Sequence, residues 1–320
     1  MSTPTLKRWG AAVGMTAAIL AATISLTGAA PSPAPTVGVG GSTDQTSALA
    51  ALGITVGDDG WINYKSALDP SATLSKATTS TVQGTLLKDG SCLIQGSVQT
   101  TGSAEVYSEE VAYNPETCAE KILSGVLPAG QDPLPGSEDP DGVVLGDAVS
   151  SRVPAAAQVK SGTVSAAATS YASAHTKTSW IDPINLTITS NTVNLKWPLY
   201  GAGGTLTSSS PTYVFPWDNW QTVSLSNTGF KTLSDNSGWY VQQNVHFVNH
   251  DFADFVYANF GPLGWLACGS LSTDQADFYH QDRITGYRSG STGNTWSDNV
   301  SGACSNLVHH ASYTGSGFVS

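Results

Sequence analysis

Positive charge is scarce in this chain of 320 residues. Lysine and arginine together number 13 against 24 aspartate and glutamate residues, and the formal net charge is −11. Because nucleic acids and anionic membranes are bound mainly through cationic side chains, this acidic balance argues against both as partners. Charged residues make up only 12% of the chain, and Ser, Thr and Gly fill the polar positions instead. Such a surface is typical of proteins outside the cell.

Sequence signatures of common enzymes are also missing. The chain has no G-x-S-x-G nucleophile elbow and no P-loop, and Gly201–Gly204 lacks the third glycine of a dinucleotide-binding turn. Glutamate does not occur after Glu138, so a carboxylate pair in the second half would need two aspartates. Glu109 and Glu110 are adjacent on a predicted strand and would point to opposite faces, so we expect two solvated side chains rather than a catalytic pair. No cofactor is expected.

The apolar run near the N-terminus is too short for a transmembrane helix. It extends from Ala11 to Leu26, whereas a spanning helix needs about 20 residues. Lys7 and Arg8 precede the run and small residues follow it, which is typical of a secretory signal peptide. We predict a signal peptide over residues 1–30 and a mature protein that is secreted, extracellular and not attached to a membrane.

Cysteine is limited to four residues in two separated couples. An even number in an exported chain is typical of disulfides, and pairing within each couple requires the least rearrangement of the chain. Neither couple has the C-x₂-C spacing of a zinc site, so no metal is expected at the cysteines. The predicted disulfides are Cys92–Cys118 and Cys268–Cys304.

Composition divides the mature chain into four segments. Residues 31–44 are rich in proline and glycine and predict a flexible tether, and residues 128–162 combine prolines with acidic residues and predict a linker. Residues 45–127 predict a small β-rich unit, in which a capping-box pattern predicts one short helix at 117–123. Residues 163–320 predict a larger β-domain.

The clearest strand pattern lies between Trp180 and Trp197. Apolar and polar residues alternate up to Ile188 and again from Val193, which predicts a β-hairpin with its turn at Ser190–Thr192. Residues 250–260 fit a helix and a strand equally well and receive no assignment. The further predicted strands are Val82–Leu87, Cys92–Val98, Ala104–Tyr113, Tyr213–Trp220, Trp239–Val248, Arg283–Tyr287 and Leu307–Tyr313.

Many short strands separated by Gly, Ser and Asn indicate a mainly β fold. The predicted architecture is a small disulfide-pinned β-rich N-terminal unit, followed by a C-terminal antiparallel β-sandwich or flattened barrel.

All six histidines lie in the second half of the chain, and four are candidates for a metal site or a polar cluster. His246 and His250 would lie about 13 Å apart on one strand, too far for one ion that binds each ligand at about 2 Å. A site would therefore need His280 or His309 from another strand, together with an aspartate. Ordinary polar histidines are the favoured interpretation.

Seven of the nine tryptophans follow residue 175. Trp217 and Trp220 are three residues apart beside a proline, so they cannot both point into one core, and we expect at least one to be exposed. An exposed tryptophan next to Asp218 would suit the stacking and hydrogen bonding of a sugar ring. The tryptophans in strand context are predicted to be core residues: Trp180, Trp197 and Trp239.

Several motifs combine tryptophan, alternating strands, turn glycines and cysteines. They are Ser91–Val98, Glu109–Cys118, Thr176–Trp197, Val245–Phe252, Asp282–Gly290 and Ser301–His310. On these motifs most of the mature chain resembles secreted β-rich proteins of filamentous actinobacteria, a family with no assigned activity. The resemblance implies export and a β-rich fold. A cysteine that it leads us to expect between Tyr200 and Ser210 is absent from this chain.

Three classes of function are compatible with these patterns. The first is a secreted non-catalytic protein that binds an extracellular glycan, a cell-wall component or another cell-surface component through exposed aromatics. The second is a secreted hydrolase that uses Asp and His chemistry, and the third is a structural protein of the envelope. Export and aromatic content without catalytic spacing favour the first class over an enzyme.

Overall fold

The structure is a computed structural model that describes residues 43–68, 73–100, 105–128, 149–153, 171–199, 204–217, 219–269 and 273–319. Within these residues the chain is mainly β, as predicted, and its strands pair antiparallel in two sheets. The predicted signal peptide lies outside the described residues, as does the predicted tether except for its last two residues.

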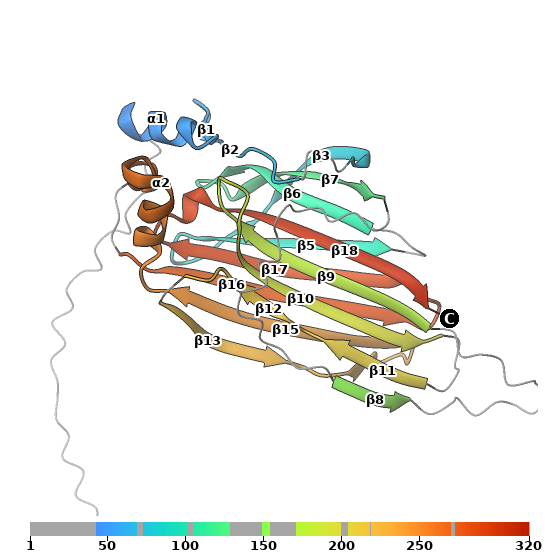
Figure 1. Cartoon of the computed structure of the whole chain (residues 1–320). Helices are drawn as coiled ribbons and strands as arrows, with labels where there is room; N and C mark the ends of the chain where they lie inside the picture. Colours follow the sequence, from blue (N-terminus) through green and yellow to red (C-terminus); the bar gives the residue numbers. More distant parts are fainter. Residues whose placement is uncertain are drawn as a thin grey trace, which may run out of the picture. The chain divides into compact units, whose positions relative to one another are not determined.

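The two sheets are called sheet A and sheet B. In the described residues sheet A has eleven strands: β1 (Thr55–Val56), β2 (Ile62–Asn63), β3 (Ser75–Gln83), β6 (Glu105–Asn114), β7 (Ala119–Leu127), β8 (Val149–Val153), β9 (Tyr171–Ile181), β10 (Thr187–Pro198), β11 (Gly204–Ser209), β12 (Thr212–Val214) and β18 (His309–Val319). Sheet B has seven: β4 (Thr85–Leu86), β5 (Cys92–Thr100), β13 (Trp220–Asn227), β14 (Lys231–Thr232), β15 (Gly238–Asn249), β16 (Ala276–Tyr287) and β17 (Thr292–Gly302). Strands β9 and β10 pack against β15 and β16, which makes the predicted sandwich (Figure 1).

The predicted turn at Ser190–Thr192 is wrong, because β10 runs straight through it. The turn lies earlier, where the Asp182 carboxylate accepts N–H groups from Ile184 and Leu186 at 3.0 and 2.8 Å. The register between β9 and β10 then shifts by one residue at Ile188. This bulge moves the apolar positions from even to odd numbers, which in the sequence looks like an interruption between two strands.

The predicted helix at 117–123 is also wrong, because β7 begins at Ala119. The Asn114 side-chain oxygen accepts the N–H groups two and three residues later, both at 3.1 Å, and Cys118 takes a left-handed φ of 53°. The chain turns back and pairs with β6. This hairpin satisfies the backbone groups that a helix would otherwise have satisfied.

Residues 45–127 do not fold apart from the rest. They are β-rich and disulfide-pinned as expected, but β6 pairs with β18 in sheet A and β5 pairs with β17 in sheet B. The described residues belong to one compact unit. Loop composition, on which the division was based, carries no information about which strands pair.

The predicted linker contains a strand. Within 128–162, β8 pairs with β11 at the edge of sheet A. Residues 129–148 and 154–162 lie outside the described residues.

Two α-helices lie next to each other at one end of the strands (Figure 1). Helix α1 (Thr43–Ala51) was not predicted, and α2 (Phe252–Cys268) settles the ambiguous stretch in favour of a helix. Helix α2 is broken at Gly261, whose φ of 62° leaves the helical region before Pro262. A short 3₁₀ turn, η1 (Ser305–Leu307), precedes β18. No helix in the described part of the chain is long and apolar enough to cross a bilayer.

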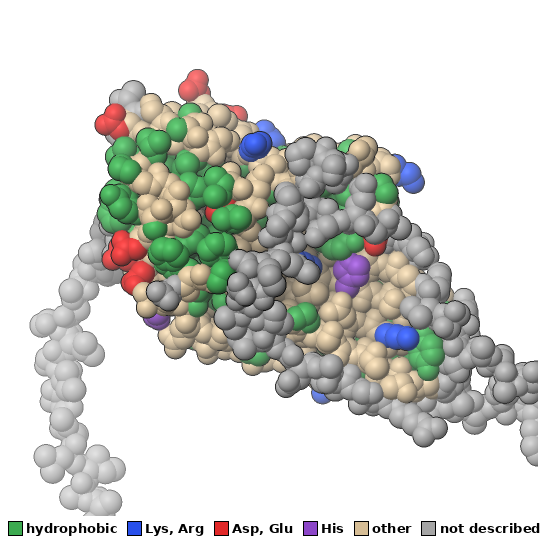
Figure 2. Space-filling view, in the orientation of Figure 1, with side chains coloured by type: hydrophobic (Ala, Val, Ile, Leu, Met, Phe, Trp, Pro, Cys, Tyr) green, Lys and Arg blue, Asp and Glu red, His purple; other side chains and the backbone are tan. Residues whose placement is uncertain are grey.

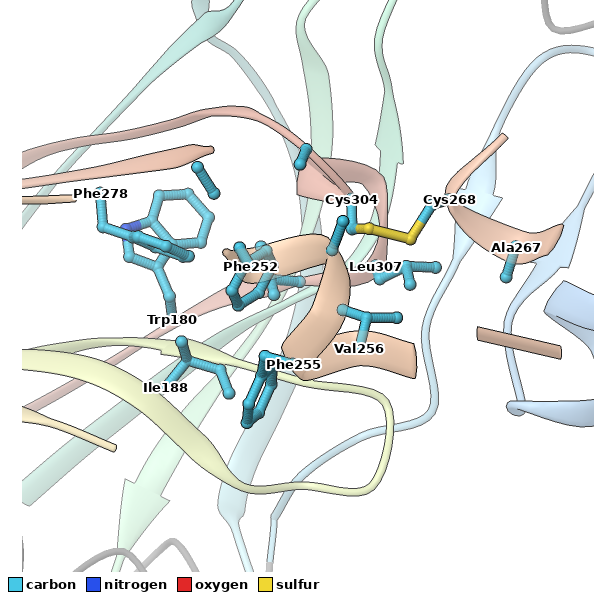
Figure 3. Packing of buried hydrophobic residues seen from close by; sticks show 14 of the residues in the cluster. Trp180, Ile188, Phe252, Phe255, Val256, Ala267, Cys268, Phe278, Cys304 and Leu307 are labelled. Carbon is cyan, nitrogen blue, oxygen red and sulfur yellow. A yellow bond between two sulfur atoms is a disulfide. The ribbon is translucent and has the colours of Figure 1, made fainter. Parts of the chain in front are cut away.

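Both predicted disulfides are confirmed. Cys92–Cys118 ties the start of β5 in sheet B to the β6–β7 hairpin of sheet A. Cys268–Cys304 ties the last residue of α2 to the segment between β17 and η1 (Figure 3). Each bridge therefore joins elements that do not pair in a sheet.

The interior has two main apolar clusters. The first, at the α2 end, contains Phe252, Phe255, Phe278 and Trp180 (Figure 3). The second lies farther along the same strands and contains Trp197, Trp239 and smaller side chains. The three tryptophans predicted as core residues are buried, with 1%, 0% and 4% of Trp180, Trp197 and Trp239 exposed.

Candidate functional site

A belt of polar side chains separates the two apolar clusters. On β16, Phe278 belongs to the first cluster and Ile284 to the second, while His280 and Asp282 lie between them. The neighbouring strands repeat this order. The polar belt consists of Thr178, Thr189, Asn191, Gln243, His280, Asp282, Asp298 and His310, all of them buried.

His280 is at the centre of the polar belt. Its Nε2 lies 2.9 Å from the Thr189 hydroxyl, and its Nδ1 lies 3.3 Å from Asp298 Oδ2. The same carboxylate oxygen lies 2.8 Å from His310 Nε2, so one aspartate serves two imidazoles. A hydroxyl, an imidazole and a carboxylate in this order resemble the triad of a hydrolase.

A second aspartate of the polar belt, Asp282 on β16 of sheet B, has its hydrogen-bond partners on β9 and β10 of sheet A. Thr178 and Asn191 donate to Asp282 Oδ2 at 2.9 and 2.6 Å. Gln243 in turn donates to Asn191 Oδ1 at 2.9 Å. Buried polar groups are retained at low cost only when they are paired, and these partners pair Oδ2 of Asp282, whereas its Oδ1 is buried without a hydrogen-bond partner among the described residues.

The two aspartates of the polar belt have opposite pKa shifts. Burial raises the pKa of Asp298, but the charge and hydrogen bonds of His280 and His310 outweigh burial and hold it below the usual range. Burial raises the pKa of Asp282 well above its usual range, and the charge of Asp298 raises it further. The surroundings therefore favour the ionised form of Asp298 and the protonated form of Asp282.

The polar belt does not have the access that catalysis needs. Thr189 and Asp298 are 0% exposed and His280 is 2% exposed. A substrate bond cannot reach the Thr189 hydroxyl without separating the sheets. A cavity of about 260 Å³ lies at the C-terminal end of β16, outside the polar belt. Its lining has amide, hydroxyl and phenol groups but no carboxylate or histidine: Gln99, Thr100, Tyr287, Ser289, Ser291 and Thr292.

The second group of buried acids lies on β6 and β7. Glu109 and Glu110, predicted as solvated, are only 1% and 2% exposed because the segment before β3 and the strand β18 cover them. Glu109 accepts from Ser66 and from the Ala67 N–H, both at 2.5 Å, and lies 3.1 Å from His309 Nε2. Strand alternation gave no sign of this cover.

The four candidate histidines lie in four separate environments. His246 is on the outer side of sheet B, where Asp277 Oδ1 lies 2.9 Å from its Nε2 and Tyr279 stacks on its ring. His250 is exposed beside Gln221, His280 is in the polar belt, and His309 is beside Glu109. In the residues that the structure describes, no three His, Cys, Asp or Glu side chains are placed to hold a metal ion.

The two candidate binding tryptophans lie between β12 and the start of β13. Trp217 is 37% exposed, with its ring edge-on to Phe255 of α2 at 5.5 Å. Trp220 is half-buried and packs against Phe278 of the core, so its exchange for alanine would disturb folding as well as binding. Asp218 lies outside the described residues. Trp217 is thus the exposed member of the pair.

Helix α2 carries a patch of exposed apolar side chains that the sequence pattern did not predict. The patch consists of Tyr257, Leu263, Trp265 and Leu266, which are 50%, 46%, 42% and 43% exposed. They are four of the ten large hydrophobic side chains exposed in the described residues. Figure 2 shows hydrophobic side chains gathered over the end of the molecule where α1 and α2 lie. We call these four residues the α2 patch.

The break at Gly261 explains why both halves of α2 take part in the patch. The first half buries Phe252, Phe255 and Val256 and exposes Tyr257, and the second half buries Ala267 and exposes three apolar side chains. The rings of Tyr257 and Trp265 meet across the break at 6.5 Å, edge to face. In the sequence this helix is apolar nearly all round, which ordinarily predicts complete burial.

Comparison of the chain with protein-family models, with curated proteins and with solved structures found no match.

Proposed function

We propose that this is a secreted, non-catalytic protein that binds a component of a cell surface through the α2 patch. The observation that carries the proposal is the exposure of two aromatic and two aliphatic side chains within ten residues of one helix. Contiguous apolar surface of this kind marks interaction sites in soluble proteins. The neighbouring Trp217 extends the aromatic surface through its contact with Phe255.

The other features of the chain support binding over catalysis. The hydroxyl–imidazole–carboxylate arrangement of the polar belt is buried between the sheets, where its role is to pair polar groups. The N-terminal sequence and the two disulfides are in keeping with an oxidising compartment outside the cytoplasm.

The test is retention of the mature protein on isolated bacterial envelopes. The double variant Trp265→Gln with Leu266→Gln should lower retention about tenfold or more, because it removes apolar contact area from the α2 patch. Leu225→Gln is the matched control, since Leu225 on β13 is 44% exposed and Leu266 is 43% exposed. Equal retention of the double variant and the control would refute the proposal.

A glycan is the second candidate ligand, and the observation that favours it is on the outer side of sheet B. Tyr279 is 39% exposed and stacks on His246, with ring centroids 3.9 Å apart and planes at 19°. Asp277 holds His246 in place. A fixed, exposed ring beside polar groups suits a sugar. Tyr279→Ala should then abolish retention on purified polysaccharide and leave retention through the α2 patch unchanged.

A further inference from the structure

The surface chemistry of the α2 patch identifies its partner more closely. From Phe255 to Thr273 the sequence contains no Asp, Glu, Lys or Arg. Leucine side chains partition into acyl chains, whereas Trp and Tyr rings favour the level of the lipid headgroups. We infer that the α2 patch is a contact surface for an electrically neutral or zwitterionic lipid layer. This inference rests on the proposed function and names the partner of the α2 patch.

The charges around the α2 patch select the type of lipid. Asp254 is exposed in the first turn of α2, and Asp274 lies beside it because its carbonyl oxygen accepts the Ala253 N–H at 3.2 Å. No Lys or Arg occurs between Thr232 and Asp282. Carboxylates repel the phosphates of anionic lipids, which attract basic segments. The same carboxylates attract the ammonium groups that phosphatidylcholine and phosphatidylethanolamine present outermost.

The acidic composition of the chain is compatible with this inference. It argues against anionic membranes, because those bind through Lys and Arg. A zwitterionic surface needs apolar contact rather than cationic side chains. The prediction that the mature protein does not attach to a membrane is therefore restricted to membranes of anionic lipids.

The size of the α2 patch favours a lipid over a protein partner. Large side chains offer about 150–250 Å² each, so four that are about half exposed leave on the order of 400 Å². A stable protein–protein interface covers roughly 800 Å² on each partner. A bilayer surface requires no matching shape, and a few side chains that penetrate it suffice for reversible attachment.

The α2 patch is formed before binding takes place. Phe252, Phe255 and Val256 fix the first half of α2 in the core, and the Cys268–Cys304 disulfide holds its end (Figure 3). Attachment therefore requires little ordering of the chain, which lowers its entropic cost.

The experiment is flotation of the mature protein with vesicles of phosphatidylcholine, alone and with added phosphatidylglycerol. The wild-type protein should float with phosphatidylcholine, and the Trp265→Gln/Leu266→Gln variant should lose about tenfold or more of its partition coefficient. Leu225→Gln should float like the wild type. Phosphatidylglycerol should weaken binding, and added salt should relieve that weakening because it screens exposed charges.

A second variant separates binding from folding. Leu263→Gln removes one side chain that is 46% exposed, and it should lower flotation by a smaller factor while the thermal transition stays that of the wild type. If this variant floats like the wild type, the α2 patch is not the lipid contact.

Three results would overturn the lipid inference. In the first, envelopes retain the wild type better than the double variant, but the wild type does not float with phosphatidylcholine. The proposed function would then stand with another partner. Another is stronger flotation when phosphatidylglycerol is present. The third is a wild-type dimer in sedimentation equilibrium that the double variant abolishes, which would make the α2 patch a protein contact. If every variant is retained on envelopes like the wild type, the proposed function itself is refuted.

Discussion

At the scale of single residues, Glu110 and Glu120 bury two carboxyl groups close to each other. Burial raises the pKa of Glu120 from 4.5 to about 8, and burial together with the charge of Glu120 raises the pKa of Glu110. Between pH 4.5 and 8 these two carboxyl groups therefore bind more protons in the folded protein than in the unfolded chain. The free energy of unfolding should fall as the pH rises through this window.

Glu120→Gln should flatten that pH dependence. Each carboxyl that is protonated only in the folded state contributes up to about 1.4 kcal/mol per pH unit. The measurement is urea unfolding of wild type and variant at pH 4.5 and at pH 8. Burial lowers the pKa of His175, so this residue makes the free energy of unfolding rise with pH. Its contribution is the same in both proteins and cancels in the comparison. Parallel pH profiles would contradict the prediction.

The two aspartates of the polar belt should respond unequally to the same substitution. Asp298→Asn removes an ionised carboxylate that serves His280 and His310, and it should lower the free energy of unfolding by about 3–5 kcal/mol at neutral pH. Asp282→Asn replaces a carboxyl whose neutral form is favoured by burial, and it should cost about 1 kcal/mol or less. Denaturant titration of both variants tests this, and equal losses would rule out opposite ionisation.

The polar belt could not have been predicted from residue types. Alternation identifies strands by assuming that polar side chains face water, and this assumption correctly located β15 and placed Trp180, Trp197 and Trp239 in the core. It fails at Asn191 and Asp282, which face inward with hydrogen-bond partners from the opposite sheet. Those partners are distant in sequence, and only the pairing of whole strands brings them together.

At the scale of elements, the second half of α2 depends on its disulfide. The bridge joins Cys268, the last residue of α2, to Cys304 across 36 residues of sequence. Replacing both cysteines by serine should cost about 2–5 kcal/mol. Hydrogen exchange should accelerate most in residues 262–268, while the strands of the polar belt keep their order of protection. Acceleration spread evenly over both sheets would show that the bridge acts on the whole fold instead.

Element boundaries were predictable where a periodic pattern was uninterrupted. The disulfide pairing followed from sequence separation alone, and it is confirmed. The bulge at Ile188 and the hairpin before Ala119 were not predictable, since each depends on how a neighbouring strand pairs. The exposed apolar side chains of α2 were not predicted, and they arise because a helix at the end of a sandwich has a neighbour on only part of its surface.

At the scale of the whole molecule, the strand pairing predicts that the protein stays in one piece when its chain is cut once. A protease site introduced between residues 129 and 148 would separate β5 and β6 from β17 and β18, yet these strands pair with each other. Neither disulfide joins the two pieces. The nicked protein should elute as one species in gel filtration and resolve into two fragments only after denaturation. A C-terminal fragment that elutes alone and folded would support two independent domains.

The position of β18 also determines when sheet A can be completed. It is the last described strand in the sequence, yet it lies between β6 and β9 in the interior of sheet A. Until it arrives, β6 and β9 each have an unpaired edge and sheet A is divided in two. During synthesis from the N-terminus, sheet A can therefore be completed only after β18 has been made, and any earlier state leaves two open strand edges to be protected from pairing with other chains.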